Sequence, residues 1–529
     1  MSQRPGGAAA KPFGGWLRRS RQRTAAPAQP TGPAPQPAEV AAVFPWRAAG
    51  EAGRAVAGVL ESLGVDYWGV HPLHTPTAIW ACHEQHWPKV LGRLQDALAS
   101  QGYALELGKS TLPLEPGRDW GDRPVPASVR LVRPVRDADT GRASTDQSCE
   151  LQLWRPTAKG TLEGQARTGV VQELPARPRV ETTPLTQWDG YRYPRPAVLA
   201  RPDQSEIDFP VDAVYLWVDG SDPAWLTRRE SVRARLGLSA DDRALAAHRF
   251  RDRGELRASL RSLEMYAPWL RRIFLVTDQQ RPSWLDPGSP RITLIDHRDI
   301  FADPEALPTY NSHAIGSQVH RIDGLADRYL IINDDVLFNK TTTPYDFFTP
   351  EGLLKVTFSR SRRPLLPLDE LNDLMRARAN SAALIEDRHN RPVTRLFAHV
   401  PVPQSLEVAR EIAAIYVEEI DATMRHPFRT GTDVEPNSWL HLYHALFTGR
   451  AVEDPVRFGY LNLTSDVHRS MMETTGGPER ALVMCVNDVA PGPDDEATSA
   501  WFTSWLQRRF PVPVGFELLA AGNSGGGGS

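Results

Sequence analysis

The residues with the clearest chemical potential are Asn333, Asp334 and Asp335, which follow the apolar run Tyr329–Ile332. Such a run predicts a strand that is buried on both faces. Carboxylates are rarely buried unless they are paired or bind a cation, and open α/β sheets bind ligands at the carboxyl ends of their strands. These residues therefore indicate a site, although Asn and Asp also cap and turn chains for local reasons.

Strand geometry limits how the two carboxylates can act. Successive side chains of a strand point to opposite faces, so Asn333 and Asp335 share one side and Asp334 faces the other if the strand continues that far. We therefore expect that Asp334 and Asp335 do not bind one ion as neighbours. One of them faces the ligand, while the other caps or braces the loop.

A second polar segment, Trp217–Asp222, joins another apolar run to the predicted start of a helix. Free backbone N–H groups and the helix dipole attract phosphate at such a position, and Gly220 allows a ligand to approach the backbone closely. The aspartates of this segment are candidates for ribose hydroxyls or a cation. The alternative is an ordinary loop in which Asp or Ser caps the helix that begins at Pro223.

Two groups later in the chain complete the set. His399 precedes two prolines that hold the backbone extended, so it is a candidate general base with a fixed direction; the alternative is a loop histidine. Arg429 could clamp phosphate oxygens or complement the end of the preceding helix. His441 and His444 lie one helical turn apart, which is a weak metal pair and more typical of a helix surface.

The elements that must position these residues alternate between strand and helix from Asp208 onward. This alternation predicts a Rossmann-like, doubly wound and mostly parallel α/β sheet with helical additions. The expected strands are 211–218, 273–277, 291–295, 329–333 and 481–486, and the expected helices are 223–236, one ending near Pro268, 312–321, 405–424, 437–447 and 497–509.

The rest of the chain predicts less chemistry. Residues 1–40 form a basic tail of disordered composition, residues 41–200 a small α+β accessory domain with a linker, and residues 523–529 an appended Gly-Ser linker. In the accessory domain we expect helices at 52–63 and 87–99, and antiparallel strands at 128–135 and 149–154.

Charge and composition exclude several classes of protein. Lys and Arg total 61 and Asp and Glu total 64, which predicts no nucleic-acid surface. Three scattered cysteines fit a reducing compartment, and no apolar run is long enough to span a bilayer. We therefore expect a cytoplasmic protein that contacts the membrane at most peripherally, through its basic tail. The alternative for the tail is a solvated segment with no role.

Several motifs together resemble the Stealth family of sugar-1-phosphate transferases. This family includes bacterial capsule and exopolysaccharide phosphotransferases and the lysosomal N-acetylglucosamine-1-phosphotransferase, and the chain is most similar to the actinobacterial CpsY type. The resemblance covers residues 208–519 and all four family blocks. The blocks are 211–223; 255–336 with Tyr310-Asn311-Ser312 and Asn333-Asp334-Asp335-Val336; His399 through Arg429; and Cys485-Val486-Asn487-Asp488 with 510–513.

The resemblance implies a reaction. A hydroxyl of a sugar or polysaccharide attacks the phosphorus next to the donor sugar of a UDP-sugar, hexose-1-phosphate such as N-acetylglucosamine-1-phosphate is transferred, and UMP leaves. By matched position the catalytic group is Asp335, His399 and Arg429, with Mg²⁺ or Mn²⁺ as cofactor and Asp335 as its ligand. The implied substrate-binding residues are Trp217, Asp219, Gly220, Ser221, Asp222, Arg257, Asn311, Ser312, Arg321, Asn333, Asp334 and Asn487. A homodimer is a further possibility.

The chain departs from the family pattern at Gly316, where members usually carry Glu. If that carboxylate lies near the donor, Gly316→Glu should alter donor affinity or preference. Two other readings of the function stay open. One is a nucleotide-sugar glycosyltransferase, which would release UDP, and the other is a degenerate polysaccharide-binding protein, which would release no nucleotide.

Overall fold

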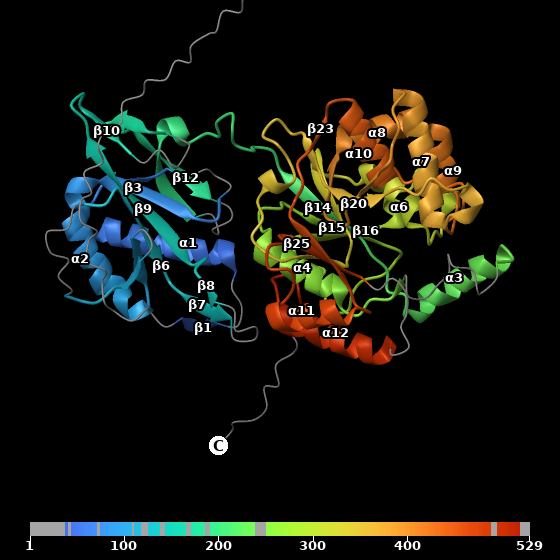
Figure 1. The fold of residues 1–529 in the computed structure, drawn as a ribbon, viewed down its shortest axis with the longest axis horizontal. Helices are drawn as coiled ribbons and strands as arrows, with labels where there is room; N and C mark the ends of the chain where they lie inside the picture. The colour runs from blue at the N-terminus through green and yellow to red at the C-terminus, as the bar shows by residue number, and fades with distance from the viewer. Residues whose placement is uncertain are drawn as a thin grey trace, which may run out of the picture.

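The computed structural model describes residues 37–40, 44–70, 75–107, 110–117, 125–137, 143–164, 171–185, 191–238, 250–487 and 495–518. These residues form two lobes (Figure 1), one built from the elements up to β13 and the other from β14 onward. Most of the predicted tail and the whole of the terminal linker lie outside the described residues. The last residues assigned to the tail form strand β1 (Ala38–Val40), which pairs with β7 (Val135–Asp137).

The N-terminal lobe is a mixed sheet that packs against two helices. Helix α1 (Pro45–Ser62) contacts β3, β9 and helix α2 (Trp87–Leu98). Strands β6 and β9 are antiparallel, as the sequence predicts. The strands of this lobe are β2 (Tyr67–Gly69), β3 (Ala78–His83), β4 (Ala104–Leu107), β5 (Ser110–Pro113), β6 (Ser128–Val132), β8 (Ala143–Ser144), β9 (Ser148–Pro156), β10 (Thr161–Glu163), β11 (Glu173–Pro175), β12 (Val180–Leu185) and β13 (Tyr191–Pro196).

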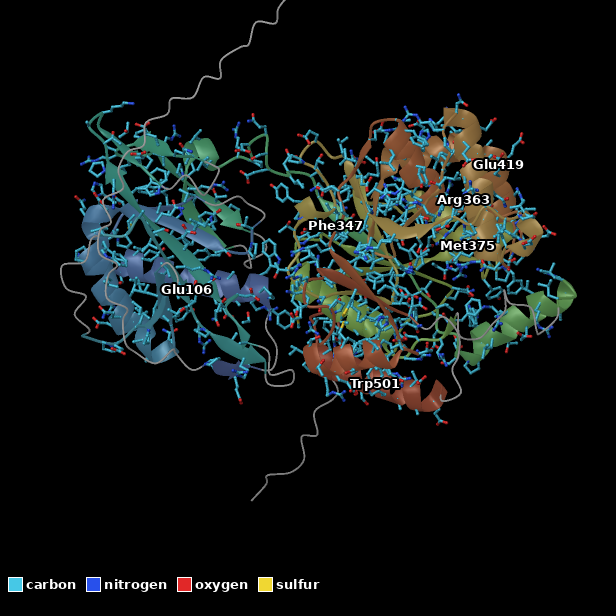
Figure 2. All side chains as sticks on the ribbon, in the orientation of Figure 1. Glu106, Phe347, Arg363, Met375, Glu419 and Trp501 are labelled. Atoms are coloured by element: carbon cyan, nitrogen blue, oxygen red, sulfur yellow. The ribbon has the colours of Figure 1, made fainter. Side chains whose placement is uncertain are left out.

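Helix α1 begins seven residues earlier than predicted and joins the two lobes. Pro45 occupies the first helical turn, where its missing N–H costs nothing. Trp46 is 1% exposed and belongs to the hydrophobic core of the C-terminal lobe, whereas Val56 and Leu60 belong to the core of the N-terminal lobe. One helix therefore anchors both cores. In Figure 2 the side chain of Glu106 lies in the N-terminal lobe and that of Phe347 in the C-terminal lobe.

The C-terminal lobe is built on the predicted parallel sheet. Four strands are parallel and the fifth, β22, is antiparallel to β17, which confirms the mostly parallel α/β fold. Its strands are β14 (Val211–Leu216), β15 (Ile273–Thr277), β16 (Ile292–Asp296), β17 (Arg328–Ile332) and β22 (Val402–Ser405), and its first helices are α3 (Pro223–Arg235), α4 (Glu255–Tyr266), α5 (His297–Ile300) and α6 (Ser312–Gln318).

The strand order places a crevice where the sequence predicts a site. The order across the sheet is β16-β15-β14-β17-β22, so the chain moves outward from β14 to β16 and then returns to the other side of β14. Ligands bind at such a reversal, outside the carboxyl ends of the two central strands. Trp217 follows β14 and Asn333 follows β17, so the two polar segments flank this switch point.

A second, small sheet closes one side of the crevice. Strand β18 (Val336–Phe338) continues from the polar segment and pairs with β25 (Val483–Asn487), which also pairs with β24 (Phe458–Asn462). Val336 lies opposite Cys485, so the end of β25 is held beside Asp335. The remaining strands are β19 (Leu354–Val356), β20 (Phe358–Arg362), β21 (Arg395–Phe397) and β23 (Ala451–Glu453).

The helical additions differ from the prediction in two places. The helix expected at 405–424 is two helices, α8 (Leu406–Ile415) and α9 (Val417–Met424), separated at Tyr416, whose φ of −108° and ψ of 41° are not helical. The helix expected at 437–447 begins as a π-helical turn, Pro436–Leu440, and continues as α10 (His441–Phe447). The other helices are α7 (Asp373–His389), α11 (Asp466–Thr475) and α12 (Asp495–Arg509). None of the described helices combines the length and the apolar character needed to cross a bilayer.

His441 makes folding sensitive to acid. The expectation of a surface histidine is wrong, because His441 is 1% exposed and its Nε2 accepts a hydrogen bond from the Ser405 N–H at 3.1 Å. Burial, together with the positive charges of neighbours, lowers the pKa of His441 to about 3. Its neutral form is therefore built into the core of the lobe.

We expect unfolding free energy to decline as pH falls from about 6.5, the ordinary histidine pKa, toward 3. In that window the unfolded state binds a proton that the folded state does not, so stability is fully present only above it; the limiting loss is roughly 4–5 kcal/mol. Urea unfolding of wild type and His441→Gln at pH 7.5, 6.0 and 5.0 measures how the unfolding free energy of each depends on pH. The variant should have a flatter pH dependence, and parallel curves would contradict the assignment.

Candidate active site

Two cavities meet at Asn333, on opposite sides of the carboxyl end of β17. We call the first the switch cavity; its volume is about 240 Å³, and its lining includes Trp217, Ser312, Asp334 and Arg429. We call the second the histidine cavity; its volume is about 470 Å³, and its lining includes His399. Because Asn333 lines both, a group bound in one cavity can reach a group bound in the other beside this residue.

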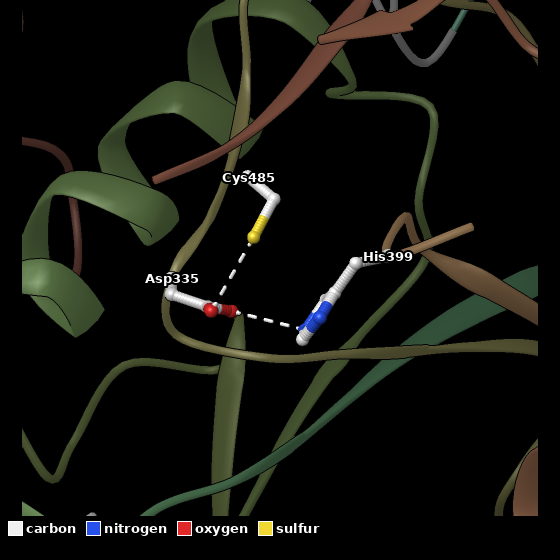
Figure 3. Close-up of side chains that lie close together, drawn as sticks. All are labelled: Asp335, His399 and Cys485. Atoms are coloured by element: carbon white, nitrogen blue, oxygen red, sulfur yellow. Dashed lines mark hydrogen bonds and ion pairs between the residues drawn. The ribbon is translucent and has the colours of Figure 1, made fainter. Parts of the chain in front are cut away.

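Asp335 and His399 contact each other (Figure 3); His399 lines the histidine cavity, whereas Asp335 lines neither cavity. The Nε2 atom of His399 lies 3.4 Å from Oδ1 of Asp335 and 2.7 Å from the amide nitrogen of Asn333. The antiparallel pairing of β22 with β17 makes this contact, since Val402 lies opposite Ile331. Asn333 and Asp335 both contact His399, and Asp334 lines the switch cavity. The expected strand alternation does not reach these residues, because β17 ends at Ile332 and Asp334 and Asp335 lie in a turn that is closed by a hydrogen bond from the Val336 N–H to the Asn333 carbonyl.

The negative charge of the Asp335 carboxylate and a positive charge on the His399 imidazole stabilise each other. Burial opposes ionisation of Asp335, but His399, Asn487 and Cys485 outweigh it and hold the pKa of this carboxyl below its usual value. Desolvation also opposes a charge on His399, and the Asp335 carboxylate outweighs it and raises the pKa of the imidazole. With Nε2 directed at Asp335 and the ring 39% exposed toward the cavity, His399 is equipped to take a proton from a ligand and Asp335 to orient it.

Strand β25 supplies the other contacts of Asp335. The Asn487 amide donates to Oδ2 at 2.7 Å, and the Cys485 thiol donates to the same oxygen at 3.4 Å. In the described part of the chain, Asp335, His399 and Cys485 are the one group of three potential ligand atoms within 4.8 Å of one another. This set does not fit Mg²⁺ or Mn²⁺, which prefer oxygen ligands, and burial raises the pKa of the Cys485 thiol well above its usual value.

Oxygen ligands for a hard cation lie on the other side of the strand end. Burial, then Asp335, Glu255 and Asp252, raise the pKa of Asp334 well above its usual value. Burial and Asp252 raise that of Glu255 to about 8. Of these three carboxylates only Asp334 lines the switch cavity, together with Asp278, and in the described part of the chain they do not bring three potential ligand atoms within 4.8 Å of one another. Asp334 is therefore a second candidate for a cation ligand beside the predicted Asp335, with the oxygen chemistry that Mg²⁺ and Mn²⁺ prefer.

Arg429 brings a positive charge to the switch cavity. Its Nη2 donates to the Ser312 hydroxyl at 2.6 Å, and both residues line the cavity together with Asp334. Of the predicted catalytic group, Arg429 therefore lines the switch cavity and His399 the histidine cavity, while Asp335 lines neither and contacts His399. A guanidinium at this position suits an anionic ligand such as a phosphate group.

A buried carboxylate holds the Arg429 loop in place. Asp433 is 0% exposed and accepts hydrogen bonds from the Asn311 amide at 2.8 Å and the Thr430 hydroxyl at 2.9 Å, and it contacts Nδ1 of His426 at 2.7 Å. Burial opposes its ionisation, but His313, His426 and its other hydrogen-bond donors outweigh it and lower the pKa of Asp433. Asn311 is itself 0% exposed and caps α6 by accepting from the His313 N–H. It thus positions Ser312 and lines neither cavity.

The Trp217–Asp222 segment divides into a cavity residue and a braced loop. Trp217 lines the switch cavity, and its indole N–H donates to Asp252 at 2.8 Å. Asp219 accepts from the Ser221 N–H and hydroxyl, and Asp222 caps α3 and accepts from Gln280. Gly220 is required because its N–H donates to the Phe250 carbonyl at 2.8 Å and a Cβ would collide with that carbonyl. The partners of this loop are thus its own backbone, Gln280 and Phe250.

Arg257 and Arg321 line neither cavity, and the same is true of Asn311, Asn487 and residues 219–222. Arg257 forms a salt bridge with Glu517 at 2.5 Å, which fastens the C-terminal segment to α4. Arg321 is exposed at the end of the short helix Val319–Arg321.

Gly316 is also remote from the switch cavity. It is buried in α6, and a Cβ at this position would collide with the side-chain amide of Asn437. A carboxylate here would point into packed protein and not at a donor. The structure therefore replaces the expectation that Gly316→Glu changes donor preference with one about folding.

We expect Gly316→Glu to destabilise the protein by about 2–4 kcal/mol, because it buries a charge against Asn437. Thermal unfolding should show a lower Tm, while KM values for several nucleotide-sugars should stay within about twofold of wild type for the protein that remains folded. Gly316→Ala serves as the control for added volume without charge. An unchanged Tm with altered donor preference would contradict this placement.

Several residues of the switch cavity were not predicted. Asp278 lines it and directly follows β15, so the rule that identified Asn333, an acidic or amide residue just after a parallel strand, would also have found Asp278. Trp225 and Tyr310 line it from separate segments and contact each other edge to face at 5.2 Å. Only tertiary packing brings these rings together, so no local signal marks them.

Protein-family models match the regions of the chain that contain most of the predicted site residues. Models of the Stealth protein conserved regions 1, 2 and 3 match residues 209–237, 249–356 and 398–446. These regions contain every predicted site residue except Asn487. An exopolysaccharide phosphotransferase of Streptomyces coelicolor is 35% identical over 481 residues, which cover 87% of this chain and 80% of the relative. The exopolysaccharide phosphotransferase CpsY of Mycobacterium tuberculosis is 35% identical over 406 residues, which cover 75% and 74% of the two chains.

Among solved structures, the galactosyltransferase LgtC in complex with donor and acceptor sugar analogues matches with a TM-score of 0.29 and 14% identity. The match covers 57% of this chain and 97% of that enzyme.

Proposed function

Because this chain belongs to the Stealth protein family, we propose that it is a sugar-1-phosphate transferase that acts in exopolysaccharide or capsule synthesis. Its donor is a UDP-sugar such as UDP-N-acetylglucosamine, and its acceptor is a sugar hydroxyl. The observation that carries the proposal is the division of polar groups at Asn333, with cationic and carboxylate groups in the switch cavity and a histidine backed by a carboxylate in the adjoining one.

The charges of the switch cavity suit the phosphates of the donor. Arg251 and Arg429 line it and can neutralise phosphate oxygens, which is the main requirement of phosphoryl transfer. The rings of Trp217, Trp225 and Tyr310 supply apolar walls. When bound, Mg²⁺ or Mn²⁺ held by Asp334, which lines the cavity, would neutralise further phosphate charge.

The acceptor hydroxyl reacts at the boundary between the cavities. Its oxygen forms a bond to the phosphorus next to the donor sugar, the bond from that phosphorus to the bridging oxygen breaks, and UMP leaves. The hydroxyl proton passes to the imidazole of His399, whose Nε2 lies 3.4 Å from Oδ1 of Asp335. Asp335 keeps the ring oriented and stabilises the imidazolium that forms. The product is a phosphodiester between the two sugars.

A screen of nucleotide-sugars with a mixture of oligosaccharide acceptors tests the proposal through the released nucleotide. We expect UMP to appear with at least one UDP-hexose or UDP-N-acetylhexosamine. Release of UDP would assign the chain to the glycosyltransferases instead. Sugar binding without nucleotide release from any donor would favour a polysaccharide-binding protein.

A further inference from the structure

Two exposed aromatic rings line the histidine cavity from β24, the strand that pairs with β25. Phe458 and Tyr460 are 36% and 43% exposed and line the cavity from β24. They are two residues apart on one strand, so their side chains project from the same face. Exposed aromatic rings on one face of a strand at a cavity offer a flat surface against which the apolar face of a sugar ring can stack.

Hydroxyl groups line the same cavity. Ser359 and Ser361 reach it from β20, where they also share a face, and Ser438 reaches it from the π-helical turn. Hydroxyls both donate and accept hydrogen bonds, so they match a ligand that is itself rich in hydroxyls. A π-helical turn is a frequent feature of functional sites, and here it places Ser438 beside Glu435.

The charges of the cavity favour a neutral ligand. Among the described lining residues the one arginine is Arg378, whose Nε donates to Glu435 at 3.0 Å. Glu435 also accepts a hydrogen bond from Ser438, and Arg378 and Glu435 are 23% and 15% exposed. This pair cancels its own charge. The switch cavity is lined by Arg251 and Arg429 and by two carboxylates, Asp278, which pairs with Arg228, and Asp334, whose pKa is raised by burial. A phosphate-bearing ligand is therefore better matched to the switch cavity, and a neutral one to the histidine cavity.

We propose that the histidine cavity is the acceptor subsite and that it binds the end of a neutral oligosaccharide, stacked on Phe458 and Tyr460, with one hydroxyl directed at His399. The proposal rests on the function proposed above. The volume of the histidine cavity, about 470 Å³, lies within the range of small-molecule sites, about 300–1,000 Å³. The cavity can therefore hold more of the acceptor than the reacting hydroxyl. The aromatic pair is then the part of the enzyme that selects the acceptor.

Binding and catalysis test this site separately. Neutral manno-, gluco- and galacto-oligosaccharides are titrated into the full-length protein and followed by tryptophan fluorescence, since Trp439 lines the cavity; the same sugars carrying a phosphodiester form a second arm. Tyr460→Ala should weaken binding of a neutral oligosaccharide about tenfold and raise the acceptor KM similarly. Tyr460→Phe should bind like wild type, because the ring remains.

Val467→Ala is the matched control, since Val467 follows β24 on α11, is 72% exposed and does not line the cavity. Failure of every neutral oligosaccharide to bind, binding of the phosphodiester forms alone, or unchanged binding by both Tyr460→Ala and Phe458→Ala would overturn the proposal. The proposed transfer reaction can be wrong while the proposed acceptor subsite is right. If wild type binds neutral sugars through Tyr460 but releases no UMP, the subsite stands and the reaction is wrong.

Discussion

Asp335→Asn is expected to lower kcat about 10³-fold, with little change in the donor KM. Nε2 of His399 lies 3.4 Å from Oδ1 of Asp335, and the carboxylate raises the pKa of the imidazole. An amide keeps the shape and the contact with Asn487 but removes the charge that stabilises the imidazolium formed on proton transfer. Steady-state kinetics of UMP release with saturating donor and acceptor measures the effect.

The pH profile distinguishes this role from a structural one. His399 accepts a proton only when it is neutral, so activity should rise with pH through its raised pKa. In Asp335→Asn the residual activity should rise at lower pH, because the charge that raised the pKa is gone. Asp454→Asn, a carboxylate 57% exposed and paired with Lys355, is the control and should be unaffected. A loss below tenfold with an unshifted profile would contradict the account.

Arg429→Ala is expected to lower kcat/KM for the donor about 10²–10³-fold. The guanidinium lines the switch cavity and is oriented by the Ser312 hydroxyl at 2.6 Å. Its loss removes a positive charge that would face the phosphate oxygens as charge redistributes in the transition state. Initial rates at subsaturating donor give the ratio directly.

Two related variants show whether charge alone is enough. Arg429→Lys should recover only part of the loss, because an ammonium group cannot reproduce the planar contacts of guanidinium. Ser312→Ala should cost about tenfold or less, and combining it with Arg429→Ala should add little, because Ser312 acts through Arg429. Full activity of Arg429→Ala, or fully additive effects, would show that the phosphates bind elsewhere.

Local patterns predicted the elements of the sheet and the residues at its edge. The strand at 273–277 is found with the predicted bounds, because a short apolar run between two breaks has few other conformations in a buried sheet. The same logic placed Asn333 and Trp217 at carboxyl ends of strands. Strand alternation did not extend to Asp335 as expected, because β17 ends at Ile332 and a turn holds Asp334 and Asp335.

Contacts between distant segments could not be predicted from those patterns. His399 reaches Asp335 only because β22 adds to the sheet beside β17, and the prolines of that segment gave no strand signal. Gly316 faces Asn437 through helix packing. The carboxylates of the Asp219–Asp222 loop are used by local caps and Gln280, an outcome that the sequence left open beside nucleotide binding.

The fate of the phosphorus next to the donor sugar tests the central claim most directly. A UDP-sugar labelled with ³²P at that phosphate is incubated with the enzyme and a neutral oligosaccharide acceptor, and the products are separated. Sugar-1-phosphate transfer predicts label in the oligosaccharide product and unlabelled UMP, both absent with Asp335→Asn. Label retained in UDP, with unlabelled sugar joined to the acceptor, would contradict the account.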